Sequence, residues 1–164
     1  MVKTIQVGPK AVCCSEHMSV TASRGGVWVA LPNEHALVRI DPVTRRPTET
    51  VRLPYCDLGA VVADNSTVWS DGGSCAAAVG RVALRARRLT GKLYEPHPVG
   101  LGFASGSVWV AVLGSADVDR IDPATARVTA RLHVGGVPVR LAVGFGSVWV
   151  EDDNGRVLRL QPTR

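Results

Sequence analysis

The sequence predicts an all-β propeller of four repeats, each about forty residues long and folded as a four-stranded antiparallel blade. Three observations support this prediction. The tryptophans recur at steps of 41, 40 and 40 residues, and each lies in nearly the same short apolar segment. Gly- and Asp-Pro-containing turns separate the β-branched runs, and no apolar run has helical periodicity. The four tryptophans are Trp28, Trp69, Trp109 and Trp149.

The third repeat shows the predicted strands most clearly. Residues 99–104 are apolar and glycine-rich, and they end in a turn at 104–106. Residues 108–112 are β-branched and aromatic, which is typical of a strand buried on both faces. A third strand around 118–121 ends at Asp122-Pro123, where the Asp side chain accepts a backbone hydrogen bond and Pro presets φ. Residues 128–134 alternate polar and apolar, as a half-exposed outer strand does.

The same pattern places the blades at about 17–53, 58–96, 98–134 and 138–164, all within a single domain. The fourth repeat stops at the turn before its outer strand. Residues 3–8 align with residues 130–135, so residues 2–7 are predicted to complete the last blade as an N-terminal strand. Four repeats fit either a small closed ring or part of a larger propeller. Self-association is expected if the propeller is incomplete.

Composition excludes several classes of protein. Hydrophobic residues make up 46% and charged residues 20% of the chain, as in a globular domain. No apolar run is long enough to cross a membrane, and the first residues lack the apolar core of a signal peptide. The net charge of +5 comes from arginines that mostly recur once per repeat, without an aromatic platform for stacking bases. We therefore expect no membrane insertion and no nucleic-acid partner.

Two segments of the third repeat carry a family resemblance. Residues 106–111 (Gly-Ser-Val-Trp-Val-Ala) and residues 120–125 (Arg-Ile-Asp-Pro-Ala-Thr) resemble the repeats of bacterial YVTN/NHL-type propellers, and are similar to those of the virginiamycin B lyase group. The resemblance covers nearly the whole chain and implies a propeller fold. It says less about activity, because such repeats serve many functions. Propellers of this group usually have six or seven blades, so four repeats are a departure.

The lyase-like group opens a lactone by elimination, with a histidine and a magnesium-held carboxylate near the axis. This resemblance implies His97 as general base, with Glu151 in a catalytic role and Asp152 as a Mg²⁺ ligand. The simpler interpretation makes His97 a turn residue and residues 151–153 a solvated hairpin tip. We favour that interpretation, and with it a non-catalytic binding module without a cofactor. The alternative is a carbon–oxygen lyase that uses Mg²⁺ and acts on a cyclic lactone, or a truncated inactive relative of such a lyase.

A binding surface is predicted on one face of the propeller. The turns after the second and fourth strands of each blade emerge together, and we call this side the loop face. The largest departure from the repeat lies there, at residues 71–76 of blade two, which include Asp71 and Ser74. A flexible loop at this place is expected to contact an unknown ligand or protein.

All four cysteines also map to the loop face. Cys13, Cys14, Cys56 and Cys75 occupy no repeated strand position, which makes them disulfide candidates. A Cys56–Cys75 bridge would pin the long loop of blade two, and Cys13 or Cys14 would take part in a second bridge. Free thiols are the second choice, and a zinc site that includes His17 is a distant third. The loop cysteines favour an extracytoplasmic location, whereas the missing signal peptide favours the opposite.

Overall fold

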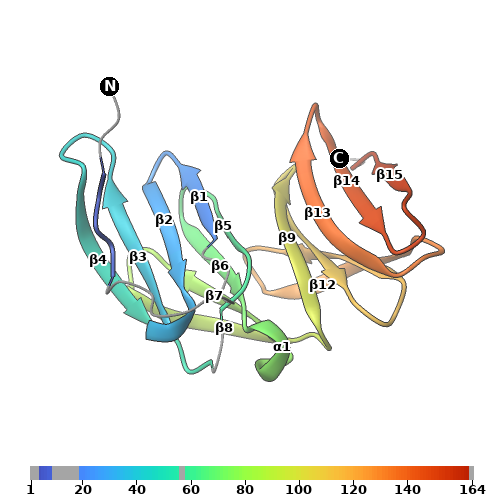
Figure 1. Ribbon diagram of the computed structural model, residues 1–164, viewed down its shortest axis with the longest axis horizontal. Helices are drawn as coiled ribbons and strands as arrows, with labels where there is room; N and C mark the ends of the chain where they lie inside the picture. Colours follow the sequence, from blue (N-terminus) through green and yellow to red (C-terminus); the bar gives the residue numbers. More distant parts are fainter. Residues whose placement is uncertain (1–3, 9–18, 56–57, 163–164) are drawn as a thin grey trace.

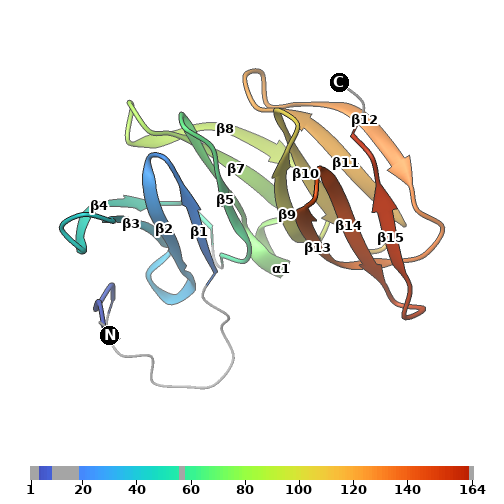
Figure 2. The ribbon, with the colours of Figure 1, turned by 90° about the horizontal axis from the view of Figure 1, so that it is seen from above.

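The computed structural model describes residues 4–8, 19–55 and 58–162. In this part of the chain, four antiparallel sheets follow one another along the sequence (Figure 1). The view from above shows them as blades that fan from blade one at the left to blade four at the right (Figure 2). The predicted all-β propeller with four blades is confirmed.

The strands of each blade lie side by side in chain order. Blade one contains β1 (Val20–Ser23), β2 (Gly26–Leu31), β3 (Ala36–Asp41) and β4 (Arg46–Arg52). Blade two contains β5 (Val61–Ala63), β6 (Thr67–Asp71), β7 (Ala78–Ala83) and β8 (Arg88–Tyr94), with the short helix α1 (Gly73–Ala76) between β6 and β7. Blade three contains β9 (Pro98–Ala104), β10 (Ser107–Val112), β11 (Asp117–Asp122) and β12 (Arg127–His133). Blade four contains, within the described residues, β13 (Pro138–Gly144), β14 (Ser147–Asp152) and β15 (Val157–Leu160).

Every blade has the same register between its second and third strands. The tryptophan lies directly opposite an arginine, and the four pairs are Trp28–Arg39, Trp69–Arg81, Trp109–Arg120 and Trp149–Arg159. Because side chains alternate along a strand, tryptophan and arginine share one face of the blade, which we call the front face. The residue after each tryptophan points to the opposite face, the back face.

The core lies between blades, where the front face of one blade packs on the back face of the next. Trp28 and Leu37 of blade one join Val61, Val68 and Val82 of blade two in one buried cluster. Equivalent clusters join Trp69 to blade three and Trp109 to blade four. In blades two and three, the side chains of the tryptophan strand therefore pack against a neighbouring blade on both faces of the strand. This explains why the strand is a continuous apolar run and does not alternate between apolar and polar residues.

Asx-type turns close the third strands, as predicted. Asp41 Oδ1 accepts hydrogen bonds from the backbone N–H groups of Val43 and Thr44, each at 2.8 Å. Asp122 Oδ1 accepts one from Ala124 N–H at 2.7 Å. These bonds hold the pKa of both carboxyls below the usual range. No helix in the described part of the chain is long and apolar enough to cross a membrane.

The N-terminal residues correct one prediction. Residues 4–8 do not complete blade four, whose described part is a three-stranded sheet. Ile5 and Val7 pack instead against Val29, Leu31 and neighbouring residues on the back face of blade one. Figure 1 shows this segment, in dark blue, beside blade one and away from blade four. The back face of blade one is apolar and has no preceding blade within the chain, so it takes up the two apolar side chains.

Candidate functional site

In blades three and four, the repeated arginine lies over its tryptophan ring and bonds a serine side chain. The guanidinium of Arg120 lies 5.6 Å from the Trp109 ring centroid, and its Nε donates to Ser107 Oγ at 2.8 Å. Arg159 is placed in the same way over Trp149, at 5.4 Å, and donates to Ser147 Oγ at 2.8 Å. Cation–π contact and hydrogen bond together fix the direction of each guanidinium.

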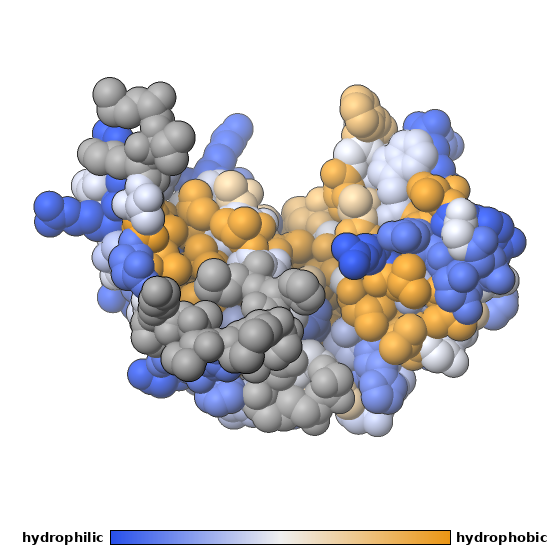
Figure 3. All heavy atoms as spheres, in the orientation of Figure 1, coloured by the Kyte–Doolittle hydropathy of each residue, from blue (hydrophilic) through white to orange (hydrophobic). Residues whose placement is uncertain are grey.

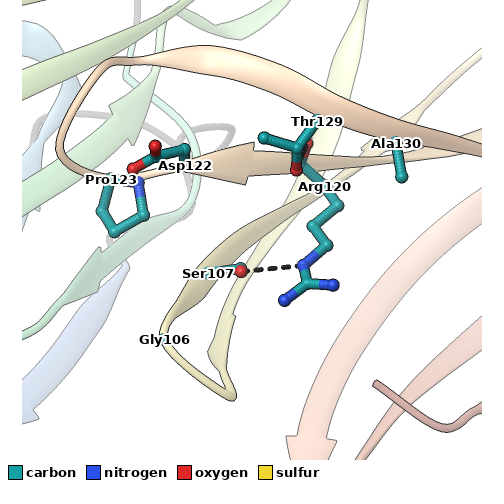
Figure 4. Close-up of a pocket in the computed structure, with 7 residues that line it drawn as sticks. All are labelled: Gly106, Ser107, Arg120, Asp122, Pro123, Thr129 and Ala130. Carbon is teal, nitrogen blue, oxygen red and sulfur yellow. Dashed lines mark hydrogen bonds between the residues drawn. The ribbon is translucent and has the colours of Figure 1, made fainter. Parts of the chain in front are cut away.

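Grooves lie beside Arg39, Arg81 and Arg120, on the face formed by the turns after the first and third strands. We call it the turn face. The groove beside blade three has a volume of about 340 Å³, and Figure 4 shows the Arg120 guanidinium in it, bonded to Ser107. A groove of about 240 Å³ between blades one and two is lined by Gly25, Arg39, Glu49, Leu84, Arg85 and Arg87.

The groove between blades two and three is the largest of the three, at about 510 Å³. Arg81 lines it and donates from Nη1 to the backbone carbonyl oxygens of Pro123, at 3.0 Å, and Ala124. Asp64 also lines it, and its Oδ1 accepts from the N–H groups of Ser66 and Thr67. These polar groups are therefore already engaged within the protein.

Arg85 borders both interblade grooves and its side chain is exposed. Arg87 is also exposed and its Nε lies 3.9 Å from Glu49 Oε1. A guanidinium with several donors directed to solvent binds carboxylates well. The turn face of blade two therefore presents positive charge at the mouths of two grooves.

The predicted loop of blade two on the loop face is a single helical turn, α1. Asp71 at the end of β6 is only 2% exposed. Its Oδ2 accepts from Ala60 N–H at 2.9 Å and its Oδ1 accepts from Gly73 N–H at 3.1 Å. Asp71 thus fixes the backbone around α1. Ser74 and Cys75 lie in α1, and nothing is described of their side chains.

The other three cysteines, Cys13, Cys14 and Cys56, lie outside the described residues. The disulfide, free-thiol and zinc alternatives therefore stay predictions.

The residues implied by the lyase resemblance lie in different surroundings. His97 is an exposed residue in the β8–β9 turn with φ of 52°, and its backbone carbonyl accepts from Leu113 N–H at 2.9 Å. Glu151 is exposed on the front face of blade four. Within the described residues, no hydrogen bond or ion pair joins His97 to Glu151 or Asp152, and no group of three or more His, Cys, Asp or Glu side chains could hold a metal ion.

Asp152 is buried and bound to Arg156. Its Oδ2 accepts from Arg156 Nε at 2.8 Å, while its Oδ1 accepts from the backbone N–H groups of Asn154 and Arg156. The side-chain bond to Arg156 is the main cause that holds the pKa of Asp152 below its usual range. Both oxygens are occupied by the β14–β15 hairpin, so this residue fits a structural role.

A buried charged cluster was not found by sequence reasoning. Glu95, after β8 of blade two, is 1% exposed, and Asp119 on the back face of blade three is fully buried. Arg131 on β12 donates from Nε and Nη2 to Asp119, at 2.8 and 2.6 Å, and its Nη2 lies 4.0 Å from Glu95 Oε1. Burial, followed by the hydrogen bond and negative charge of Asp119, raises the pKa of Glu95 to about 7.

The sequence offered one signal for this cluster, which is Asp119, an aspartate in the third strand of blade three on the face that packs against blade two. Because both carboxyls are buried and Arg131 lies beside them, the cluster links blade two to blade three.

The sequence matches no protein-family model and no curated protein. Solved structures similar to it include the computationally designed Ika4 protein, with 12% identity and a TM-score of 0.71 over 93% of this chain and 95% of Ika4. Hydrazine synthase from Kuenenia stuttgartiensis has 15% identity and a TM-score of 0.68, over 92% of this chain and 51% of that one. A streptogramin B lyase has 14% identity and a TM-score of 0.62, over 88% of this chain and 54% of the lyase.

The chain thus spans about half the length of the hydrazine synthase chain and of the lyase. At such low identity the likeness shows the fold alone, and these proteins have varied functions. The β-propeller is shown. The YVTN/NHL-type assignment stays a prediction.

Proposed function

We propose that this chain is a non-catalytic binding module whose turn face takes up a carboxylate-rich segment of a partner protein. The observation that carries the proposal is the position of Arg85, an exposed cation at the mouths of two interblade grooves. The loop face, where the sequence predicts a ligand, offers the short helical turn α1, and the carboxylate of Asp71 before it already accepts hydrogen bonds from backbone N–H groups.

The charge of the chain supports an acidic partner. The net charge is +5, and Arg85 and Arg87 add exposed guanidinium groups beside the grooves. Attraction between these groups and an acidic segment speeds association and weakens as salt screens it. Arg81 and Asp64 shape the largest groove but are held by internal hydrogen bonds. Arg85 is therefore the group that we expect to contact the partner's carboxylates.

A fluorescein-labelled hexaglutamate peptide tests this proposal by fluorescence anisotropy at low and moderate salt. We expect saturable binding that weakens with salt, and an affinity about tenfold lower for Arg85→Glu. Arg52→Glu is the matched control. Arg52 is an exposed arginine at the end of β4 in blade one, toward the loop face, and its Nη1 donates to the Glu34 carbonyl oxygen. Equal loss in both variants would mean that net charge alone attracts the peptide, and this result, like no binding at all, contradicts the proposal.

The lyase-like alternative rests on the family resemblance and on fold likeness to a streptogramin B lyase. A Mg²⁺ ion would need carboxylate oxygens that are open to it. Asp152 does not fit this role, because Arg156 and two backbone N–H groups occupy its oxygens. We therefore derive no catalytic step through a metal ion at this site.

A further inference from the structure

The front face of blade four has the residues of an interblade interface, but no blade among the described residues covers it. Val157 is 67% exposed, whereas the residues at the equivalent position of the other three blades, Leu37, Val79 and Val118, are all fully buried. Trp149 is also partly exposed, although the other three tryptophans are at most 2% exposed. Blade four therefore ends in an uncovered apolar face.

The back face of blade one is the complementary surface. Val20 on β1 is 66% exposed, whereas Val61 and Leu101, at the same position of blades two and three, are 4% and 6% exposed. In those blades the position is covered by the front face of the preceding blade. Figure 3 shows apolar surface over both blade one and blade four, on either side of a hollow.

The uncovered face of blade four already has the geometry of a covered one. Arg159 lies 5.4 Å from the Trp149 ring and bonds Ser147, as Arg120 lies 5.6 Å from Trp109 and bonds Ser107 in blade three. In blade three this arrangement packs against Val148 and Val150 of the next blade. The equivalent residues of blade one are Val27 and Val29.

The N-terminal segment lies where the outer strand of a preceding blade belongs. Leu132 and Val134, at the end of blade three, pack on the back face of blade four. Ile5 and Val7, which align with them in sequence, pack on the back face of blade one in the same way. Residues 4–8 therefore occupy the place of the outer strand of a preceding blade, and the described residues contain no other strand of that blade.

We propose that the blade completing this arrangement is blade four of a second copy of the chain. Two copies joined end to end, with a two-fold axis between them, bury in each copy the front face of blade four and the exposed part of the back face of blade one around Val20, and give a ring of eight blades. Symmetric dimers are the commonest closed assembly, and eight blades lie within the usual range for propellers. Residues 4–8 of each copy add a fourth strand to β15 of the other.

The strand register follows from blade three. There Leu132 lies opposite Val118, and Val118 is the equivalent of Val157. Ile5 of one copy is therefore placed opposite Val157 of the other. On the front face of blade four, Arg140 lies opposite Glu151 across neighbouring strands, so opposite charges meet in the proposed interface.

Light scattering coupled to size-exclusion chromatography tests the dimer over a range of concentrations. The expected mass is twice the 17.4 kDa of one chain. Val157→Asp places a charge in the dimer interface but on the surface of the monomer, so we expect a folded monomer and dimerisation weakened by about 100-fold or more. Val43→Asp is the matched control, since Val43 is 83% exposed in the β3–β4 turn, and it should leave the dimer intact.

Hydrogen exchange tests the added strand. The outward-facing amides of β15 should exchange slowly at concentrations where the dimer forms and fast in Val157→Asp. A monomer at every concentration would mean that another molecule, or none, covers these faces, and it overturns the proposal. A dimer that survives Val157→Asp, open polymers in place of a dimer, or unprotected β15 amides in the dimer each overturn it as well.

Discussion

Replacement of Glu95 by glutamine should make the stability of the protein less dependent on pH. Glu95 has an ordinary pKa of 4.5 when exposed and a pKa of about 7 in the folded protein, mainly because it is buried. The folded state therefore holds the Glu95 proton more tightly than the unfolded state does. The stability that this proton provides is fully present below pH 4.5 and is lost as pH rises to about 7.

The size of the effect follows from the two pKa values. Their difference corresponds to a loss of about 3 kcal/mol of unfolding free energy between pH 4 and pH 8. Glutamine is neutral at every pH and its amide can donate to Asp119 as the protonated carboxyl does. Glu95→Gln should match the wild type near pH 4 and exceed it by up to about 3 kcal/mol at pH 8.

Urea unfolding followed by tryptophan fluorescence, from pH 4 to pH 8.5, measures this difference. Other carboxyls that titrate in the same range cancel between variant and wild type. Glu34→Gln, the same chemical change at a partly exposed position, is the control for the loss of one carboxyl group. A difference between Glu95→Gln and wild type that does not change with pH would refute the reasoning.

Two further predictions concern a hairpin and a close contact between blades. Asp152→Asn should lower the Tm by a few degrees at pH 7, and this difference from the wild type should shrink on acidification. The pKa of Asp152 is lowered in the folded protein, so this carboxylate stabilises the fold only while it is ionised. Calorimetry at several pH values measures the difference in Tm. Gly100→Ala should cost about 1–3 kcal/mol in urea unfolding, because its Cβ would lie 3.1 Å from Leu141 N, whereas Gly144→Ala meets nothing within 4 Å and is the control.

The sequence predicted the blades well because each is a local unit. The tryptophan period, the β-branched runs and the Asp-Pro turns all act over a few residues, and the strands form where these patterns place them. The sequence also predicted that residues 2–7 pair with blade four of the same chain, and this was wrong. The error has the same origin, because a repeat pattern is local. The repeat identified Ile5 and Val7 as an outer strand, but a repeat has the same phase in every blade and does not state which blade receives the strand.

The candidate sites were harder to predict because they depend on contacts between blades. Glu95 and Asp119 are distant in sequence and meet only where blade two packs on blade three. The grooves beside Arg85 likewise need residues from three blades. The roles expected for His97, Glu151 and Asp152 were based on single positions in a repeat. A position in a repeat does not indicate which groups surround the side chain. Asp152 is an example, because Arg156 donates a hydrogen bond to its carboxylate.

The packing of each blade on its neighbours also determines which part of the protein unfolds first. Blades two and three are each packed on both sides, whereas blade four is packed on one side only. In such a nearest-neighbour array, local unfolding is cheapest at the end that makes a single contact, and it spreads inward one unit at a time. A lone chain should therefore fray from its C-terminal blade, with blades two and three as the most slowly opening foldon.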